Sequence, residues 1–294
     1  MSVYGGVYMT ASFLSVLFVL FSGSSFAATY SQQIPYYGED FYNDLSSGVQ
    51  NEELVARLQT VLRSQHRVIP GQMDEITDNC NGTKGCYQHI SLGYDRARIF
   101  LLGVYYLVDE GNGNYGLPDV YCANIRYSNE FRGTPPGPRT IPDSTTLNTE
   151  HTWPQSRFTG KFDKGMQKSD LHHLYPADSE MNSVRGNNEF GEVSRDSKVL
   201  KCRVSRTGKG TGGGAEIFEP PTGHKGNVAR ALFYFSVRYS TPISPNQEKV
   251  LRKWHLEDPV DEEEMHRNNE IQKTQGNRNP FIDFPELVDY IHNF

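Results

Sequence analysis

The fold is decided by two stretches of sequence, Asn148-Thr-Glu-His-Thr-Trp-Pro-Gln-Ser156 and Asp170-Leu-His-His-Leu-Tyr-Pro-Ala-Asp178. Weak alternation of polar and apolar residues over 145–151 predicts a short strand. Pro154 ends regular pairing soon afterwards, because proline cannot donate to a sheet ladder. Residues 178–188 read as the start of a helix. The order predicted for this region is therefore strand, loop, strand, helix.

The side chains in these stretches suit one kind of chemistry. Glu150 offers a hard carboxylate ligand and Asn182 a carbonyl oxygen, and both suit Mg²⁺. His151 has an ordinary pKa near 6.5, so its neutral form can take a proton from water. Lysines and arginines nearby can hold phosphate oxygens. A metal, a base and cations together describe phosphodiester hydrolysis.

The adjacency of Glu150 and His151 sets a geometric condition on such a site. Neighbouring residues on a strand point to opposite faces of the sheet. The two side chains can therefore share a site only if the strand ends or bends there, or if the site wraps around its tip. A helix beginning near residue 178 would aim Asn182 back toward the strand pair.

The rest of the chain contributes further elements but no long linker or repeat. Helices are expected over residues 51–67, 227–239 and 248–255, from apolar positions spaced on one face. Residues 119–127 are expected to form a strand, and residues 94–109 a helix or a strand. The run GKGTGGG, residues 208–214, is expected to be a flexible loop. It lacks the ending of a phosphate-binding P-loop.

Composition and charge narrow the class of protein. The chain has 294 residues, of which 36% are hydrophobic and 12% aromatic, enough to build a sizeable core. Its net charge of −6 argues against coating nucleic acid by bulk charge. Residues 148–240 nevertheless carry a net charge of +4, while each flank carries −5. That excess favours an anionic ligand, although an ordinary charge fluctuation explains it equally well.

The N-terminus has the features of an export signal. Residues 1–38 contain no charged side chain, and residues 13–21 read FLSVLFVLF. Ser25 and Ala27 fit a small-x-small cleavage site, so residues 1–27 are predicted to be a signal peptide. The mature protein, residues 28–294, is then secreted or periplasmic, without stable membrane association after cleavage. An uncleaved membrane anchor is the alternative.

Export places the four cysteines in an oxidising compartment, where they can pair. Cys80 and Cys86 bracket a short loop, which would leave Cys122 and Cys202 as a long-range pair. Four cysteines allow three connectivities, and four free thiols are a further possibility.

The two stretches resemble the endonuclease I family of exported, non-specific nucleases. The family pattern runs Asn-x-Glu-His-x-x-Pro, then Asp-Leu-His-His/Asn-Leu-x-Pro, then an Asn followed by an Arg-Gly/Ser-Asn run that ends near Phe-Gly. The matching residues here are Asn148, Glu150, His151 and Pro154; residues 170–174 and Pro176; Asn182 and residues 185–187; and Phe190 and Gly191. With further C-terminal matches, the resemblance covers about residues 118–285.

The resemblance implies a fold and a set of roles. The fold would be α+β, a mainly helical single domain over residues 28–294, built around a ββα-metal (His-Me) finger at about 145–191. His151 would be the general base, and Glu150 and Asn182 would hold one divalent cation, Mg²⁺ or alternatively Mn²⁺ or Ca²⁺. A monomer would cut DNA or RNA and leave 5′-phosphate and 3′-hydroxyl ends.

Other residues of the region receive less specific roles. Arg185, Lys161 and Lys164 are candidate phosphate contacts, although Arg185 could equally be a salt-bridge partner. Asp170, His172 and His173 are candidates for a supporting layer behind the site, in which Asp170 either fixes an imidazole by a hydrogen bond or, equally, shapes a turn or the start of a strand.

Three alternatives remain open beside a non-specific nuclease. One is an RNA-preferring extracellular ribonuclease of the same family. Another is a member that binds nucleic acid without cutting it. The third is a zinc hydrolase of another substrate that uses His172 and His173, although no His-Glu-x-x-His motif supports it.

Overall fold

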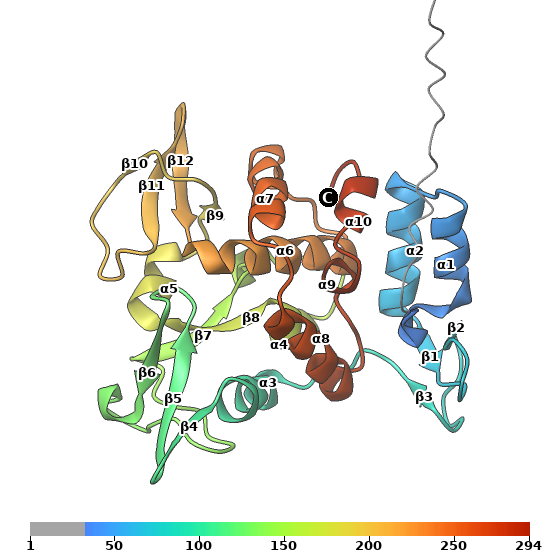
Figure 1. Cartoon of the computed structure of the whole chain (residues 1–294), viewed down its shortest axis with the longest axis horizontal. Coiled ribbons are helices and arrows are strands. Elements are labelled where there is room, and N and C mark those ends of the chain that lie inside the picture. Colours follow the sequence, from blue (N-terminus) through green and yellow to red (C-terminus); the bar gives the residue numbers. More distant parts are fainter. Residues whose placement is uncertain (1–32) are drawn as a thin grey trace, which may run out of the picture. The chain divides into compact units, whose positions relative to one another are not determined.

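The long helix α6, Lys225–Tyr239, is the centre of the structure (Figure 1). Every residue from Gly226 to Tyr239 is buried, as expected for a helix enclosed on all sides. It packs against α2, α7 and α9. The computed structural model describes residues 33–294, so the predicted signal peptide lies outside the described residues.

Helices and small sheets are mixed along the chain, in agreement with the α+β prediction. The helices are α1 Gly38–Ser46, α2 Asn51–Arg63, α3 Tyr94–Phe100, α4 Lys164–Ser169, α5 Ser179–Arg185, α6 Lys225–Tyr239, α7 Pro245–Glu257, α8 Glu262–Gln275, α9 Pro280–Asp283 and α10 Leu287–Tyr290. A π-helical turn, Leu101–Tyr105, continues α3.

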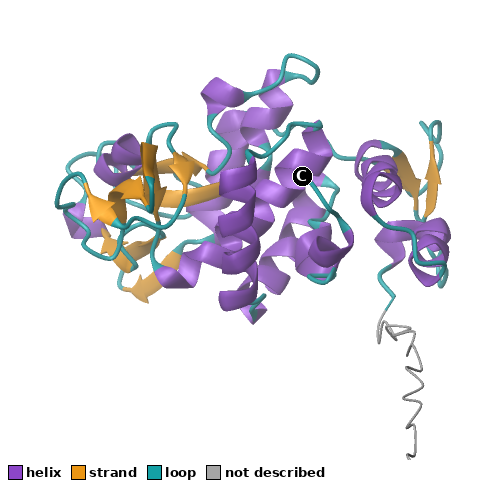
Figure 2. Ribbon diagram, turned by 90° about the horizontal axis from the view of Figure 1, so that it is seen from above, coloured by secondary structure: helices purple, strands orange, loops and turns teal. Residues whose placement is uncertain are grey.

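Within residues 33–294 the strands form four separate sheets. All of them except the small N-terminal sheet lie on one side of the helices (Figure 2). The N-terminal sheet has the order β2-β1-β3, from β1 Gln65–Arg67, β2 Glu75–Thr77 and β3 Cys86–Tyr87. The next runs β4-β5-β6, from β4 Val108–Gly111, β5 Asn114–Asp119 and β6 Asn124–Tyr127. The third pairs β7 Leu147–His151 with β8 Leu174–Asp178. The last runs β10-β11-β12-β9, from β9 Glu189–Phe190, β10 Arg195–Asp196, β11 Arg206–Gly210 and β12 Gly213–Glu219.

The predicted order of strand, loop, strand and helix is confirmed by β7, β8 and α5. The two strands are antiparallel, with Glu150 opposite Tyr175. Asp178 caps α5 by accepting hydrogen bonds from two backbone N–H groups of its first turn. Gly186, with φ of +54°, ends the helix in a conformation that favours glycine. Leu147, Leu171 and Leu174 anchor this unit in a core cluster shared with α3, β5 and α8.

Two predictions of local structure were wrong. Residues 119–127 are not one strand, because the Asp119 carboxylate accepts hydrogen bonds from the backbone N–H groups of Tyr121 and Cys122 and turns the chain between β5 and β6. Residues 208–214 are not a loop but the tip of the β11–β12 hairpin. Sequence reasoning missed the hairpin because glycine is a weak strand former, whereas here positive φ at Gly212 and Gly213 permits the tight reversal.

Other expectations held with shifted boundaries. The helix expected over 51–67 ends at Arg63, and the chain then enters β1. Residues 94–109 begin as α3 and end in β4. The helices expected over 227–239 and 248–255 are α6 and α7.

The cysteines pair as Cys80 with Cys86 and Cys122 with Cys202. Among the described residues, no helix combines the length and the apolar character needed to cross a bilayer.

Candidate active site

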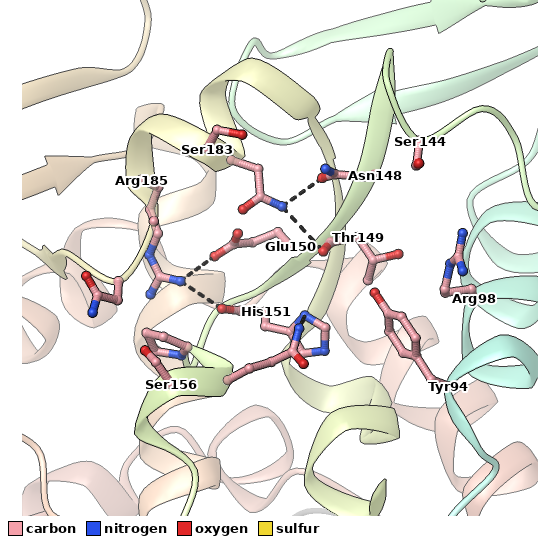
Figure 3. Close-up of a pocket in the computed structure, with 15 residues that line it drawn as sticks. Tyr94, Arg98, Ser144, Asn148, Thr149, Glu150, His151, Ser156, Ser183 and Arg185 are labelled. Atoms are coloured by element: carbon pink, nitrogen blue, oxygen red, sulfur yellow. Dashed lines mark hydrogen bonds and ion pairs between the residues drawn. The ribbon is translucent and has the colours of Figure 1, made fainter. Parts of the chain in front are cut away.

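A polar pocket of about 570 Å³ lies along β7 and the start of the following loop (Figure 3). Four consecutive residues, Asn148 to His151, line it together with Asn182. Side chains from both faces of β7 reach one pocket because, among the described strands, β7 pairs only with β8 and ends at His151. This arrangement meets the condition that the sequence set for Glu150 and His151 to share a site.

The carboxylate of Glu150 is almost completely buried, with 1% of the side chain exposed. Arg185 Nη1 donates a hydrogen bond to its Oε1 at 2.8 Å. Burial raises the pKa of Glu150, and the positive charge of Arg185 counters part of that shift. The pair therefore places a carboxylate oxygen of Glu150 beside the guanidinium of Arg185 in the lining of the pocket.

The amide of Asn182 is held with its oxygen available for a ligand. Its Nδ2 donates to Asn148 Oδ1 at 2.7 Å and to the carbonyl oxygen of Thr149 at 3.3 Å. A backbone carbonyl can only accept, so the second contact fixes which end of the amide is nitrogen. Within residues 33–294, Oδ1 of Asn182 has no hydrogen-bond donor.

The imidazole of His151 is held in one tautomer. Its Nε2 lies 3.0 Å from the carbonyl oxygen of Lys168, which can only accept, so Nε2 carries the proton. Nδ1 of the neutral ring is then an acceptor, and Gln155 Nε2 approaches it at 3.4 Å. Burial is the main cause that lowers the pKa of His151 to about 3, and the neighbouring His173 adds to the decrease. The ring is therefore neutral near pH 7. The neutral form is the one that can accept a proton.

A buried polar layer lies behind His151. The ring centre of His173 is 5.4 Å from that of His151, and His173 Nε2 donates to the carbonyl oxygen of Gln167 at 2.7 Å. Asp170 accepts hydrogen bonds at 2.8 Å from Tyr234, Tyr239 and Gln275.

Burial alone would raise the pKa of Asp170, but the neighbouring histidines, led by His89, and the Gln275 hydrogen bond hold it below its usual range. His172 Nε2 donates to the carbonyl oxygen of Asn277 at 3.3 Å. None of Asp170, His172 and His173 is among the described residues that line the pocket. Their supporting role stays a prediction.

The candidate phosphate contacts are distributed differently from the expectation. Arg185 lines the pocket, but its guanidinium is buried against Glu150 and donates to the carbonyl oxygens of His151 and Thr152. Lys161 and Lys164 are exposed and do not line the pocket. The structure thus brings Arg185 to the site and leaves both lysines outside it, and all three assignments stay predictions.

Several residues of the site carried no usable signal in the sequence. The carbonyl oxygen of Lys168 is backbone, so no residue type announces it. Gln155 stands in the first motif but received no role from it. Tyr94 and Arg98 of α3 line the pocket from a segment in which the sequence showed nothing beyond an apolar element.

The sequence of this chain is similar to those of known proteins. A profile of the family described as endonuclease I matches residues 107–286. The extracellular ribonuclease of Bacillus subtilis (strain 168) is 36% identical over 186 residues, which cover 57% of this chain and 60% of that protein. The extracellular ribonuclease of Bacillus amyloliquefaciens is 38% identical over 163 residues, with coverage of 49% and 53%.

An extracellular deoxyribonuclease of Aeromonas hydrophila is 34% identical over 127 residues, which cover 42% of this chain and 53% of that protein. The chain thus spans between half and three fifths of the length of these relatives. The profile, in contrast, covers more than half of this chain and includes β7, β8 and α5 with Glu150, His151 and Asn182. The chain belongs to the endonuclease I family.

Proposed function

We propose that this protein is a metal-dependent endonuclease that hydrolyses phosphodiester bonds of DNA and RNA with little sequence preference. The observation that carries the proposal is the unprotonated Nδ1 of His151, held in one pocket with two candidate oxygen ligands, Glu150 and Asn182. Relatives named as ribonucleases and as a deoxyribonuclease support a polynucleotide substrate.

Glu150 and Asn182 fit a hard divalent cation. A carboxylate and an amide carbonyl are the ligand types that Mg²⁺ prefers, and Mg²⁺ needs few protein ligands because it keeps several waters. The free Oδ1 of Asn182 is the observation that supports this fit. Mn²⁺ and Ca²⁺ are the alternatives. When bound, the cation would neutralise negative charge that develops on the phosphate and the leaving oxygen.

His151 would act as the general base. Its Nδ1 takes a proton from the attacking water, and the positive charge that forms on the ring is stabilised through Nε2–H by the carbonyl oxygen of Lys168. General-base catalysis of this kind contributes typically about 10²–10⁴-fold. Attack by water does not need a 2′-hydroxyl, so the same site could cut either polymer and leave 5′-phosphate ends.

Three further parts of the proposal concern the whole protein. The unit of β7, β8 and α5 is proposed to be the His-Me finger of the family. Residues 1–27 are proposed to be a signal peptide, so that a monomer is released outside the cytoplasm. The names of the relatives, extracellular and periplasmic, support export.

A cleavage assay tests the function. Plasmid DNA and a folded RNA are incubated with the purified protein, first with Mg²⁺ and then with excess EDTA. We expect cutting that EDTA abolishes, and a loss of about 10²–10⁴-fold in rate for His151→Ala. Ligation of the DNA fragments without kinase treatment would report 5′-phosphate ends. Near-native cleavage by correctly folded His151→Ala would refute the assignment of the base.

The same assay separates the alternatives. Cleavage of RNA far faster than DNA under matched conditions would select the RNA-preferring ribonuclease, a reading favoured by the names of the two Bacillus relatives. Binding without cleavage of either polymer would select the non-catalytic member. Activity at low ionic strength should fall steeply with added salt, because phosphate contacts release counterions.

A further inference from the structure

The helix α3 forms a second wall of the pocket. Figure 3 shows Tyr94 and Arg98 on one side and Arg185 on the other, with Glu150 and His151 between them. Among the described residues, the arginines that line the pocket are Arg98 and Arg185. The two arginines differ in how firmly the protein already holds them.

Arg185 is committed to the protein, whereas Arg98 is available. The Arg185 side chain is 2% exposed and bonds to Glu150 and to two backbone carbonyls. Among the described residues, Arg98 makes one ion pair, a 3.4 Å contact with Asp95, in which the Arg98 and Asp95 side chains are 23% and 80% exposed. An exposed helical pair of this kind is worth about 0.3–0.5 kcal/mol. A phosphate can therefore replace Asp95 as the partner of Arg98 at little cost.

Tyr94 holds Arg98 and His151 on the same scaffold. The guanidinium carbon of Arg98 lies 5.3 Å from the Tyr94 ring centre, and that centre lies 5.5 Å from the His151 ring centre. Since the two distances are joined at Tyr94, the guanidinium is at most about 11 Å from the imidazole. A nucleic acid strand carries a phosphate about every 3.4 Å along its axis in a duplex. A cation within about 11 Å of the imidazole can therefore contact a phosphate close to the one at which His151 activates water.

We propose that Arg98 binds a phosphate that neighbours the one being cleaved, and that α3 thereby forms one side of the polynucleotide groove. The inference rests on the proposed nuclease function and adds a substrate contact to it. Arg98 and Tyr94 precede residues 107–286, the segment that the family profile matches. The contact therefore comes from the arrangement of α3 beside β7 rather than from the family resemblance.

Binding measured in a cleavage-deficient background tests the inference. Each variant carries His151→Ala, and the dissociation constant for a labelled single-stranded DNA is measured over a series of NaCl concentrations. Arg98→Gln should weaken binding several-fold and reduce the slope of log K against log salt by about 0.7, the value for one lost contact to single-stranded nucleic acid. Arg98→Lys should restore most of the slope, because lysine keeps the charge.

Arg96→Gln is the matched control. Arg96 lies on the same helix and is exposed, and it is not among the described residues that line the pocket. Arg96→Gln changes the net charge by the same amount as Arg98→Gln but removes no group from the pocket. The slope of log K against log salt should therefore stay nearly unchanged. In the active protein, Arg98→Gln should raise KM several-fold and change kcat less than twofold.

The outcomes distinguish this inference from the proposed function. If Arg98→Gln behaves like Arg96→Gln while the unsubstituted protein cleaves nucleic acid, Arg98 is not a phosphate contact and the inference fails alone. If the unsubstituted protein neither binds nor cleaves DNA or RNA, the proposed function and the inference fail together. Should Arg98→Gln lose its native circular dichroism, Arg98→Met against Arg96→Met gives the decisive comparison, in which a phosphate contact predicts a larger rise in KM for Arg98→Met.

Discussion

Removal of Arg185 should destabilise the protein strongly even though it lines a solvent-filled pocket. In the native state its guanidinium bonds to the buried carboxylate of Glu150 and to the carbonyl oxygens of His151 and Thr152. Arg185→Met leaves a buried charge without its partner, a change that costs about 3–5 kcal/mol. The carbonyl oxygens of His151 and Thr152 also lose their donor, and each buried unsatisfied group costs about 1–3 kcal/mol. The loss of stability should therefore lie toward the upper end of the range of about 3–5 kcal/mol.

Thermal unfolding is monitored by circular dichroism. The buffer contains EDTA, so that no metal occupies the pocket. For a protein of this size, a loss of about 1 kcal/mol in unfolding free energy lowers Tm by about 2 °C. Arg185→Met should therefore lower Tm by about 6–10 °C. Arg157→Met is the matched control, because Arg157 pairs with Glu189 at 3.3 Å with both side chains 30–40% exposed. Its loss should cost less than about 1 kcal/mol.

A double variant sharpens the interpretation. Glu150→Gln removes the buried charge, so Arg185→Met should be milder in that background, and the two effects should be less than additive by 1 kcal/mol or more. A decrease of less than about 2 °C for Arg185→Met, or strict additivity, would show that Arg185 is not the structural partner of Glu150. Arg185 would then be free to serve as the phosphate contact that its sequence position first indicated.

Three further results are expected. Burial lowers the pKa of His224 from its ordinary 6.5 to about 3, so this group leaves the stability unchanged above pH 6.5 and lowers it as the pH falls from 6.5 toward 3. His224→Phe should thus reduce the loss of unfolding free energy between pH 6.5 and pH 3 by up to about 1.4 kcal/mol per pH unit, and an unchanged dependence of Tm on pH would contradict this. Loss of the Cys122–Cys202 link, with a separation of 80 residues, should cost about 4–5 kcal/mol in urea unfolding, against about 2 kcal/mol for the six-residue loop; a reversed order would argue against the chain-entropy account. Gln155→Leu should lower single-turnover cleavage less than tenfold, because its 3.4 Å contact to His151 Nδ1 is weak; a loss as large as that of His151→Ala would give Gln155 a greater role.

Much of the candidate site could be predicted from the sequence because its proposed ligands and base are side chains in, or just after, two short motifs. Glu150 and His151 are adjacent, and the helix start at Asp178 places Asn182 near the strand pair. Local rules of capping and alternation act over a few residues, so they predicted β7 and α5 with small boundary errors. The apolar spacing of α6 and α7 was equally clear.

Local sequence rules could not predict contacts made by backbone groups or by residues far apart in the sequence. The carbonyl oxygen of Lys168 selects the tautomer of His151, yet any residue type at 168 would supply it. The glycine-rich run at 208–214 pairs as a hairpin because strand pairing depends on partners rather than on glycine's own preference.

The amino-acid sequence by itself indicated that Glu150, His151 and Asn182 meet in one pocket, because they lie close together along the chain and repeat the pattern of a family. Only the tertiary structure decided which of the nearby cations are available. It buries Arg185 against Glu150, leaves Lys161 and Lys164 outside the pocket, and brings in Arg98 from α3. The physical reason is that burial and ion pairing depend on the packing of segments far apart in sequence, which no local pattern records.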